Sequence, residues 1–506
     1  MKIVLTYHFL ELLINFLKKH YRIIISLLII SVGIILRIKL FINNNSFIFD
    51  ETALAANVIS LEWKNLFNPL EYEQVCPPLC LALFKIFHTA TKNLLPYEAS
   101  FRIIPFLCGL FMLPAFAYLL KILNNKIYFI WTGLLLLALN KTAIIYSCTI
   151  KQYSVELFVT ICLLILFYKT NINQLSNKKL LFLFLLISII PFLSFVSYFI
   201  IFSGMLLWFI NCYKTKSLKK FFKFAFIPLI FFILFYTFYY KNVFIAQSSF
   251  MFNYWQNTNP HFLNSDNFIF NVKFYLMNLL KLQMPYNYTI DNITHFLMKI
   301  FYLLCGIILF YQIKLKNYKN ILLILLPIII TIISGFFFYP FVERCILFIL
   351  PCLIIFISLV LSPIKQTKYI TVLFIIVIFN LLNNIYINSK SSFPQSIKSL
   401  YQVLTQYNPE MKNIFATKCC YVAYSGKSTL LYNLDIWKNF DKNEFNNFIQ
   451  NLPAGDYYIY LPYDRYKSDY NEEILSYLKN SKLVKIAKIH FEDPHKAEFT
   501  AHIIKK

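Results

Sequence analysis

The segment IIISLLIISVGIILRIKLFI, residues 23–42, decides the fold class because it is an almost uninterrupted apolar run. A helix that crosses a bilayer needs about 20 such residues, and this run is long enough. No small-residue cleavage site follows it, so we interpret it as a retained membrane helix rather than a signal peptide. The amphipathic residues before it end in Lys18, Lys19 and Arg22, which predicts a helix on the membrane surface over residues 1–22.

The composition of the whole chain agrees with that segment. Of the 506 residues, 59% are hydrophobic and 14% are charged, whereas soluble proteins carry about 25% charged residues. The net charge of +25 comes from Lys and Arg that lie mainly in short connections between apolar runs. Basic residues in that position face the anionic cytoplasmic leaflet of a membrane, so the charge does not indicate a nucleic-acid partner.

Further apolar runs follow, and together they predict an all-α polytopic membrane domain of about eleven transmembrane helices over residues 23–387. The stretch 180–212 is divided into two spans because of its length and because Pro191 lies within it. The predicted spans after the first are 101–123, 127–146, 153–168, 180–196, 197–212, 221–240, 295–312, 321–338, 344–362 and 369–387.

The basic connections between these runs set the orientation. With this number of spans they all fall on one side, and cytoplasmic loops carry an excess of Lys and Arg. We therefore expect a multi-pass protein of the plasma (inner) membrane with a cytoplasmic N-terminus and an outer C-terminus. The basic connections are 121–126, 169–179, 213–220, 314–319 and 364–368.

The outer side then holds two long loops and a tail. Loops 43–100 and 241–294 are of a size that is usually functional. The tail, residues 388–506, is expected to be a small soluble α/β domain, because helix-like patterns after Pro394 and Asp441 alternate with strand-like segments. The expected strands are 456–461, 484–491 and 499–504.

Ionisable groups near the outer ends of the spans are the candidates for chemistry, because such groups are costly to bury in a membrane. Asp50 and Glu51 come shortly after the first span, and a carboxylate held there can act as a general base. The alternative is that both acids cap the helix that follows them. Glu98 and Arg102 have i, i+4 spacing on one helix face, which favours an ordinary ion pair between them.

Three other charged residues are candidates. Lys151 and Glu156 lie around the start of the span 153–168, where a carboxylate one turn inside an apolar helix is either functional or structural. Arg344 lies on the outer side, where the positive-inside tendency gives it no reason to be. Its fork of donors suits a phosphate, and the alternative is an interfacial Arg paired with Glu343. The outer carboxylates could also hold a divalent cation, although no metal-binding motif is present.

Several short motifs, each weak alone, occur in an order that is similar to one family. They are Asp50-Glu51-Thr52-Ala53, Gln74 to Leu79 with Pro77-Pro78, Glu98 to Pro105, Tyr146-Ser147 with Lys151-Gln152-Tyr153-Ser154, and Phe341-Val342-Glu343-Arg344. With them, the chain up to about residue 390 resembles GT-C glycosyltransferases of the dolichyl-phosphate-mannose protein mannosyltransferase type (glycosyltransferase family 39-like). The bacterial aminoarabinose transferases belong to the same superfamily.

The resemblance implies a GT-C fold and a sugar transfer with inversion on the outer face. The donor would be a polyprenyl-phosphate sugar, and the acceptor a hydroxyl of a lipid, a glycan or a protein. No cofactor is certain, and a divalent cation is left open. The implied catalytic residues are Asp50, Glu51 and Glu156, and the implied substrate-binding residues are Glu98, Arg102, Lys151, Tyr153 and Arg344.

Two other function classes stay open on the sequence alone. A transporter or flippase of lipid-linked glycans would have charges near the bilayer midplane and interrupted helices there, whereas these charges cluster at the outer rim. A surface-glycan polymerase also has large outer loops, but the paired acids of the first loop favour the transferase.

The topology gives the first testable prediction. A cysteine introduced near Asp456 should react with a membrane-impermeant reagent in intact cells, because the tail is expected on the outer side. Labelling that requires permeabilised cells would contradict the predicted number of spans.

Overall fold

The structure, a computed structural model, describes residues 2–243, 318–337, 340, 342–361 and 423, together with five strands of the tail. Side chains are described from His20 onward, except those of Phe49, Phe336, Phe337, Val360 and Leu361, and not for the strands. The spans predicted at 295–312 and 369–387 lie outside the described residues, as do most of the second outer loop and the predicted tail helices.

The described chain is helical up to the tail, and four of its helices are long and apolar enough to cross a membrane. This indicates a multi-pass membrane protein. The four candidate spans are His20–Ile42, Tyr97–Leu123, Leu218–Val243 and Tyr318–Gly335, and each overlaps a span predicted from the sequence.

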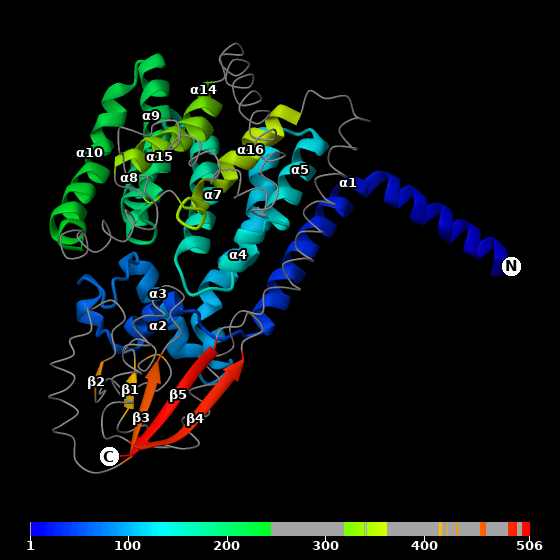
Figure 1. The fold of residues 1–506 in the computed structure, drawn as a ribbon. Coiled ribbons are helices and arrows are strands. Elements are labelled where there is room, and N and C mark those ends of the chain that lie inside the picture. Colours follow the sequence, from blue (N-terminus) through cyan, green and yellow to red (C-terminus); the bar gives the residue numbers. More distant parts are fainter. Residues whose placement is uncertain are drawn as a thin grey trace, which may run out of the picture.

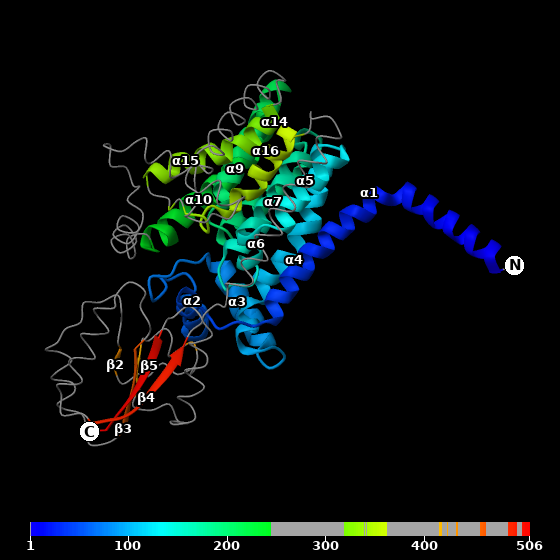
Figure 2. The ribbon, with the colours of Figure 1, turned by 45° about the vertical axis from the view of Figure 1, so that its right-hand side comes forward.

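The predicted surface helix and the first predicted span form one continuous helix, α1 (Lys2–Ile42). Its N-terminal part projects away from the other helices, and its C-terminal part runs along α4 (Tyr97–Leu123) and α5 (Ile127–Ala138) (Figures 1 and 2). The first outer loop contains helices too short to span: α2 (Phe49–Ser60), η1 (Trp63–Asn65) and α3 (Pro78–Thr91).

The rest of the bundle follows the predicted apolar runs. It consists of α6 (Lys141–Tyr146), α7 (Tyr153–Lys169), η2 (Ile172–Gln174), α8 (Asn177–Ile189), η3 (Ile190–Phe192), α9 (Ser197–Lys214), α10 (Leu218–Phe235), η4 (Tyr236–Tyr240), α14 (Tyr318–Asn320), η6 (Ile321–Leu325), α15 (Leu326–Phe337), η7 (Leu347–Ile349) and α16 (Leu350–Leu361). The prediction of two helices over 180–212 is confirmed, with Pro191 in the turn between them.

The single span predicted over 127–146 is wrong, because the helix breaks after Ala138. The side chain of Asn140 accepts a hydrogen bond from the backbone N–H of Ala143 at 2.8 Å and so begins the short helix α6. The guanidinium of Arg37, fully buried on α1, donates to the carbonyls of Ala138 at 3.2 Å and Leu137 at 3.4 Å. The Leu137 carbonyl also accepts from the backbone N–H of Asn140 at 3.3 Å, and Arg37 adds a donor to both carbonyls at the end of α5. Hydropathy alone could not reveal this break.

The span predicted to begin at Arg344 also begins later. Residues 342–346 form a turn, and regular helix starts only with η7 and α16. Arg344 is therefore displayed on a turn at the end of the bundle rather than on a helix face.

Three of the predicted basic connections meet at one end of the bundle. The ammonium of Lys220 donates to the carbonyls of Asn173 at 2.9 Å and Leu175 at 2.7 Å. The hydroxyl of Tyr318 donates to the side chain of Asn211 at 3.1 Å. The connections around 173, 215 and 318 therefore share one side, as the orientation argument requires.

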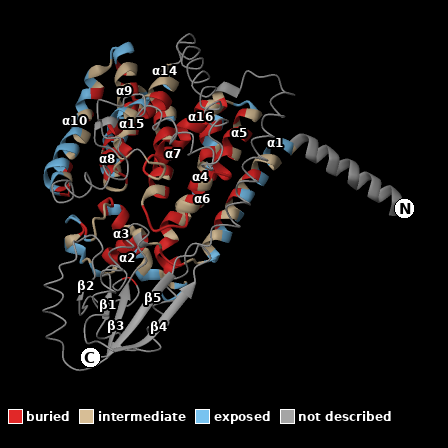
Figure 3. Cartoon of the chain, viewed as in Figure 1, coloured by how far each residue is buried: buried red, intermediate tan, exposed pale blue. Residues whose placement is uncertain are grey.

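Much of the outward surface of α10 is exposed (Figure 3), and beyond Lys223 its exposed side chains are apolar. Phe222 and Leu229 are 58% and 57% exposed. An exposed apolar stripe along most of a helix is unfavourable in water and ordinary against lipid.

The tail contains a five-stranded mixed sheet of order β2-β1-β3-β5-β4. The strands are β1 (Ile414–Ala416), β2 (Tyr432–Asn433), β3 (Asp456–Leu461), β4 (Val484–Glu492) and β5 (Glu498–Lys505), so the three predicted strands are confirmed. Strand β1 is parallel to β2 and β3, whereas β5 is antiparallel to β3 and β4. Both ribbon views place the sheet at the end of the bundle that carries α2 and α3 (Figures 1 and 2). The hydroxyl of Tyr97, at the start of α4, donates to the carbonyl of Ala423.

A close helix contact gives a prediction for stability. A Cβ added at Gly109 of α4 would lie 2.4 Å from Cβ of the buried Ser147, so Gly109→Ala should reduce the free energy of unfolding by about 1–3 kcal/mol. Thermal unfolding of the purified protein in detergent measures this change. The control is Phe111→Leu on the same helix, where the side chain is 57% exposed and the effect should stay within about 0.5 kcal/mol. An unchanged melting temperature for Gly109→Ala would mean that α4 and Ser147 do not pack as described.

Candidate functional site

The centre of the site is an ion pair between two residues 294 positions apart. Asp50 lies in the first turn of α2, and Arg344 lies on the turn before η7. Nη1 of Arg344 donates to Oδ2 of Asp50 at 2.8 Å, and the side chains are 30% and 36% exposed. Both groups therefore remain accessible to a ligand. Arg344 pairs with Asp50 rather than with Glu343, whose carboxylate accepts from the hydroxyl of Thr142.

Lys151 is the second cation beside Asp50. It is buried in the turn before α7, and its ammonium donates to Oε1 of Gln74 at 2.5 Å. Burial raises the pKa of the Asp50 carboxyl, but the charges of Lys151 and Arg344 outweigh burial and leave that pKa below its ordinary value. Burial also lowers the pKa of the Lys151 ammonium, although the Asp50 carboxylate opposes this shift. Asp50 is therefore ionised at neutral pH and surrounded by positive charge.

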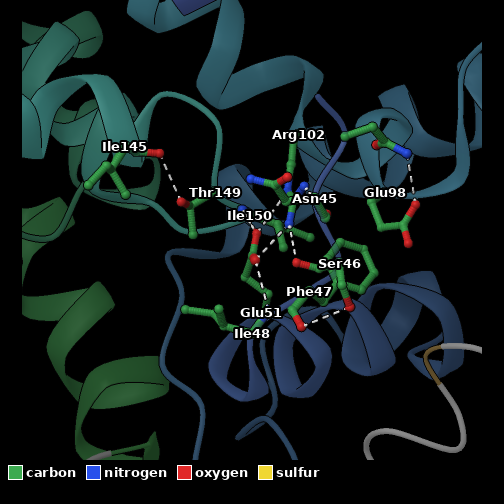
Figure 4. Close-up of polar contacts among 11 residues, drawn as sticks. Asn45, Ser46, Phe47, Ile48, Glu51, Glu98, Arg102, Ile145, Thr149 and Ile150 are labelled. Atoms are coloured by element: carbon green, nitrogen blue, oxygen red, sulfur yellow. Dashed lines mark hydrogen bonds and ion pairs between the residues drawn. The ribbon is translucent and has the colours of Figure 1, made fainter. Parts of the chain in front are cut away.

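Glu51, next to Asp50 in sequence, is in a different environment (Figure 4). Its oxygens accept from Nε of Arg102 at 3.0 Å and from Nη2 of Arg102 at 2.8 Å, and the two side chains are 3% and 7% exposed. The backbone N–H groups of Ile150, at 2.8 Å, and Ile48, at 3.1 Å, also donate to Glu51. The capping alternative is therefore correct for Glu51, which caps α2 through Ile48, while Asp50 points to Arg344.

The structure corrects the expected pairing of Glu98 with Arg102. Arg102 makes its bidentate contact with Glu51, and it also donates to the carbonyls of Asn45 at 2.6 Å and Ser46 at 3.3 Å. The carboxylate of Glu98, which is fully buried, accepts from the side chain of Asn44 at 3.1 Å. The i, i+4 rule describes exposed helix faces. Here Arg102 pairs instead with Glu51, 51 residues away, because the buried carboxylate of Glu51 needs a counter-charge.

Beside Arg344 lies a cavity of about 310 Å³ between α6 and the turn before η7. Its walls are Lys141, Thr142, Ile145, Tyr146, Val342, Glu343 and Arg344. Tyr146 meets Tyr153, a predicted site residue, edge to face with ring centroids 5.0 Å apart. The cavity and the Asp50 pair therefore share one residue, Arg344.

Glu156 lies apart from this group. It is buried in the first turn of α7. The structure thus brings together Asp50, Lys151, Tyr153 and Arg344, gathers Glu51 with Arg102 in a separate buried pair, and gives Glu156 no described contact with either.

Three residues of functional interest were not predicted. Gln74 was noted only within a motif, and it holds Lys151. Tyr146 was likewise only part of a motif, and it lines the cavity. Arg37 had a usable signal, since an arginine within an apolar membrane run is rare and tends to have a specific partner.

The acidic groups do not form a metal-binding set. Asp50 and Glu51 are each paired with an arginine, and the described residues contain no cluster of three or more His, Cys, Asp or Glu side chains that could hold an ion. No step is therefore assigned to a divalent cation.

Substitution of the two neighbouring acids should change the free energy of unfolding by very different amounts. Glu51→Gln leaves the buried guanidinium of Arg102 without its counter-charge, so it should reduce the free energy of unfolding by about 3–5 kcal/mol. Asp50→Asn removes a partly exposed pair and should change it by about 1 kcal/mol at most. Thermal unfolding in one detergent compares the two variants directly. Equal losses would contradict the division of roles between Asp50 and Glu51.

The sequence matches no known protein-family model, and no curated protein matches it.

Proposed function

We propose that this chain is a membrane glycosyltransferase that moves a sugar from a polyprenyl-phosphate donor to an acceptor hydroxyl, with inversion at the anomeric carbon. The observation that carries the proposal is the ionised, accessible Asp50 between the cations Arg344 and Lys151, beside a cavity. A base next to two cations suits a reaction that removes a proton and releases a phosphate.

Asp50 is the general base of the proposed reaction. The acceptor O–H gives its proton to Asp50 while its oxygen forms a bond to the anomeric carbon. The bond between that carbon and the phosphate oxygen breaks on the opposite face, and polyprenyl phosphate leaves with the electron pair. Since Asp50 is already ionised, it does not have to lose a proton before it acts.

Arg344 and Lys151 stabilise the leaving phosphate. A guanidinium has five donors in a planar fork, so Arg344 can contact Asp50 and a phosphate oxygen at the same time. Lys151 is held by Gln74 in a buried position, where a charge interaction is stronger than in water. A phosphate that draws Arg344 towards itself would also raise the proton affinity of Asp50, because it removes part of the positive charge from the base.

The remaining predicted site residues have supporting roles in this proposal. Glu51, Arg102 and Glu98 position the loop that carries Asp50, since their contacts are with protein groups. Glu156 would assist from α7 once the site is occupied, and Tyr153 orients Tyr146.

The proposed architecture places this site on the outer face of the plasma membrane. It is a GT-C-like domain of about eleven spans, followed by a soluble α/β tail on the same side as the site. The position of the sheet beside α2 and α3 and the meeting of the basic connections at 173, 215 and 318 support that arrangement. The donor chain would remain in the bilayer while the acceptor, a lipid, glycan or protein, approaches from outside.

The general base gives the prediction for activity. Asp50→Asn keeps the size of the side chain but removes its basic charge, so sugar transfer should slow by about 10²–10⁴-fold at equal protein level. The assay incubates native membranes with a panel of polyprenyl-phosphate sugars and identifies the acceptors by mass spectrometry.

The matched control is Glu62→Gln, a carboxylate of the same outer loop that is 64% exposed and pairs only with Lys64 among the ion pairs of the described residues. It should transfer sugar at the wild-type rate. If Asp50→Asn also keeps that rate, Asp50 is not the base.

A further inference from the structure

We propose that the cavity between α6 and the turn at 342–346 holds the glycosyl group of the donor, and that Glu343 and Lys141 select an uncharged monosaccharide. The inference rests on the proposed transferase function and adds a substrate class to it. None of these wall residues except Arg344 has a role in the reaction described above.

The size of the cavity matches one sugar ring. Pockets for small molecules usually measure about 300–1,000 Å³, and this one measures about 310 Å³. The cavity is open on one side, so the phosphate and the lipid of a donor can extend from it. The polyprenyl chain would then lie along the apolar surface of the bundle.

The walls offer both kinds of partner that sugar hydroxyls need. The carboxylate of Glu343 accepts hydrogen bonds, and it is fixed by the hydroxyl of Thr142. The ammonium of Lys141 donates hydrogen bonds from the opposite wall, on α6. The ring of Tyr146, fixed edge to face by Tyr153, adds an apolar surface for the C–H face of a sugar.

The charges of the walls select against an acidic sugar. Lys141 and Glu343 offset one another, so the cavity has no excess charge to hold a second anion besides the donor phosphate, which Arg344 and Lys151 would bind. The carboxylate of a uronic acid would meet the like charge of Glu343 as well as the opposite charge of Lys141, so these two walls give it no net attraction.

Arg344 connects the cavity to the reacting atoms. It lines the cavity and also contacts Asp50 at 2.8 Å. A sugar in the cavity whose phosphate lies on Arg344 therefore presents its anomeric carbon near the base, as transfer requires.

The test measures lipid binding rather than transfer, with the full-length protein in nanodiscs. The probes are short-chain polyprenyl-phosphate esters of glucose, galactose, mannose, arabinose and glucuronic acid, together with bare polyprenyl phosphate. The wild type should bind at least one neutral ester about tenfold more tightly than the bare phosphate, and the glucuronic acid ester no more tightly than the bare phosphate.

Variants then assign the preference to the cavity. Glu343→Gln, which can still accept from Thr142, should lose the roughly tenfold preference for the ester but keep its affinity for the bare phosphate. Lys141→Met should do the same, and it provides a second test if Glu343→Gln does not fold. Arg344→Gln should weaken binding of both lipids, whereas the control Glu62→Gln should change neither.

Each other outcome counts against a specific statement. A wild type that binds neither lipid overturns the proposed function and this inference with it. A wild type that binds esters and bare phosphate equally, or variants that lose both equally, overturns the sugar-binding role of the cavity and leaves the transferase proposal standing.

Discussion

The arrangement of the site depends on the buried ion pair between Glu51 and Arg102. Two charges out of water are tolerated only with close geometry and further hydrogen bonds, and this pair has both. Its contacts join α2, the start of α4 and the turn before α7. The backbone N–H of Ile150 and the carboxylate of Glu51 are bonded directly, and their sequence neighbours are Lys151 and Asp50. The buried pair therefore fixes the positions of Asp50 and Lys151, because each is adjacent in sequence to a residue that the pair holds.

The adjacent carboxylates of Glu51 and Asp50 have different surroundings and therefore different roles. Glu51 accepts hydrogen bonds from four described donor groups on Arg102, Ile48 and Ile150, and it is closed to a ligand. Among the described residues, Asp50 accepts one side-chain hydrogen bond, from Arg344, and it is 36% exposed. One residue provides rigidity, and the next provides an accessible charge on that rigid support. The spacing of the side chains by about 100° on a helix is what lets neighbours face different directions.

The sequence predicted the parts of the fold that depend on local apolar patterns. The helices near 101–123, 153–168, 180–212 and 221–240 and the three strands of the tail needed only periodicity, length and Pro191. The membership of Asp50, Lys151 and Arg344 in one site could also be expected, because the motif order and the predicted topology put all three on the same side of the helices. Which charged residues pair with one another could not be predicted from the sequence. Which carboxylate Arg102 meets depends on contacts 51 residues apart, and the break of the helix at Ala138 depends on Arg37 of another helix. A hydropathy pattern is an average over many residues, so it does not reveal a contact made by one polar side chain.

Arg37 also constrains how the chain is assembled in the membrane. When α1 enters the bilayer, its arginine has no access to the carbonyls of Leu137 and Ala138, which are made about 100 residues later. Until α5 arrives, a charged side chain within the apolar run disfavours insertion by about 2.5–3.5 kcal/mol at the centre of a helix, and by less near its end. Arg37 lies near the C-terminal end of α1, and α1 is placed in the membrane at lower cost once α5 is present to pair with it. Membrane insertion of this protein is then a cooperative event, in which a later helix completes the placement of the first.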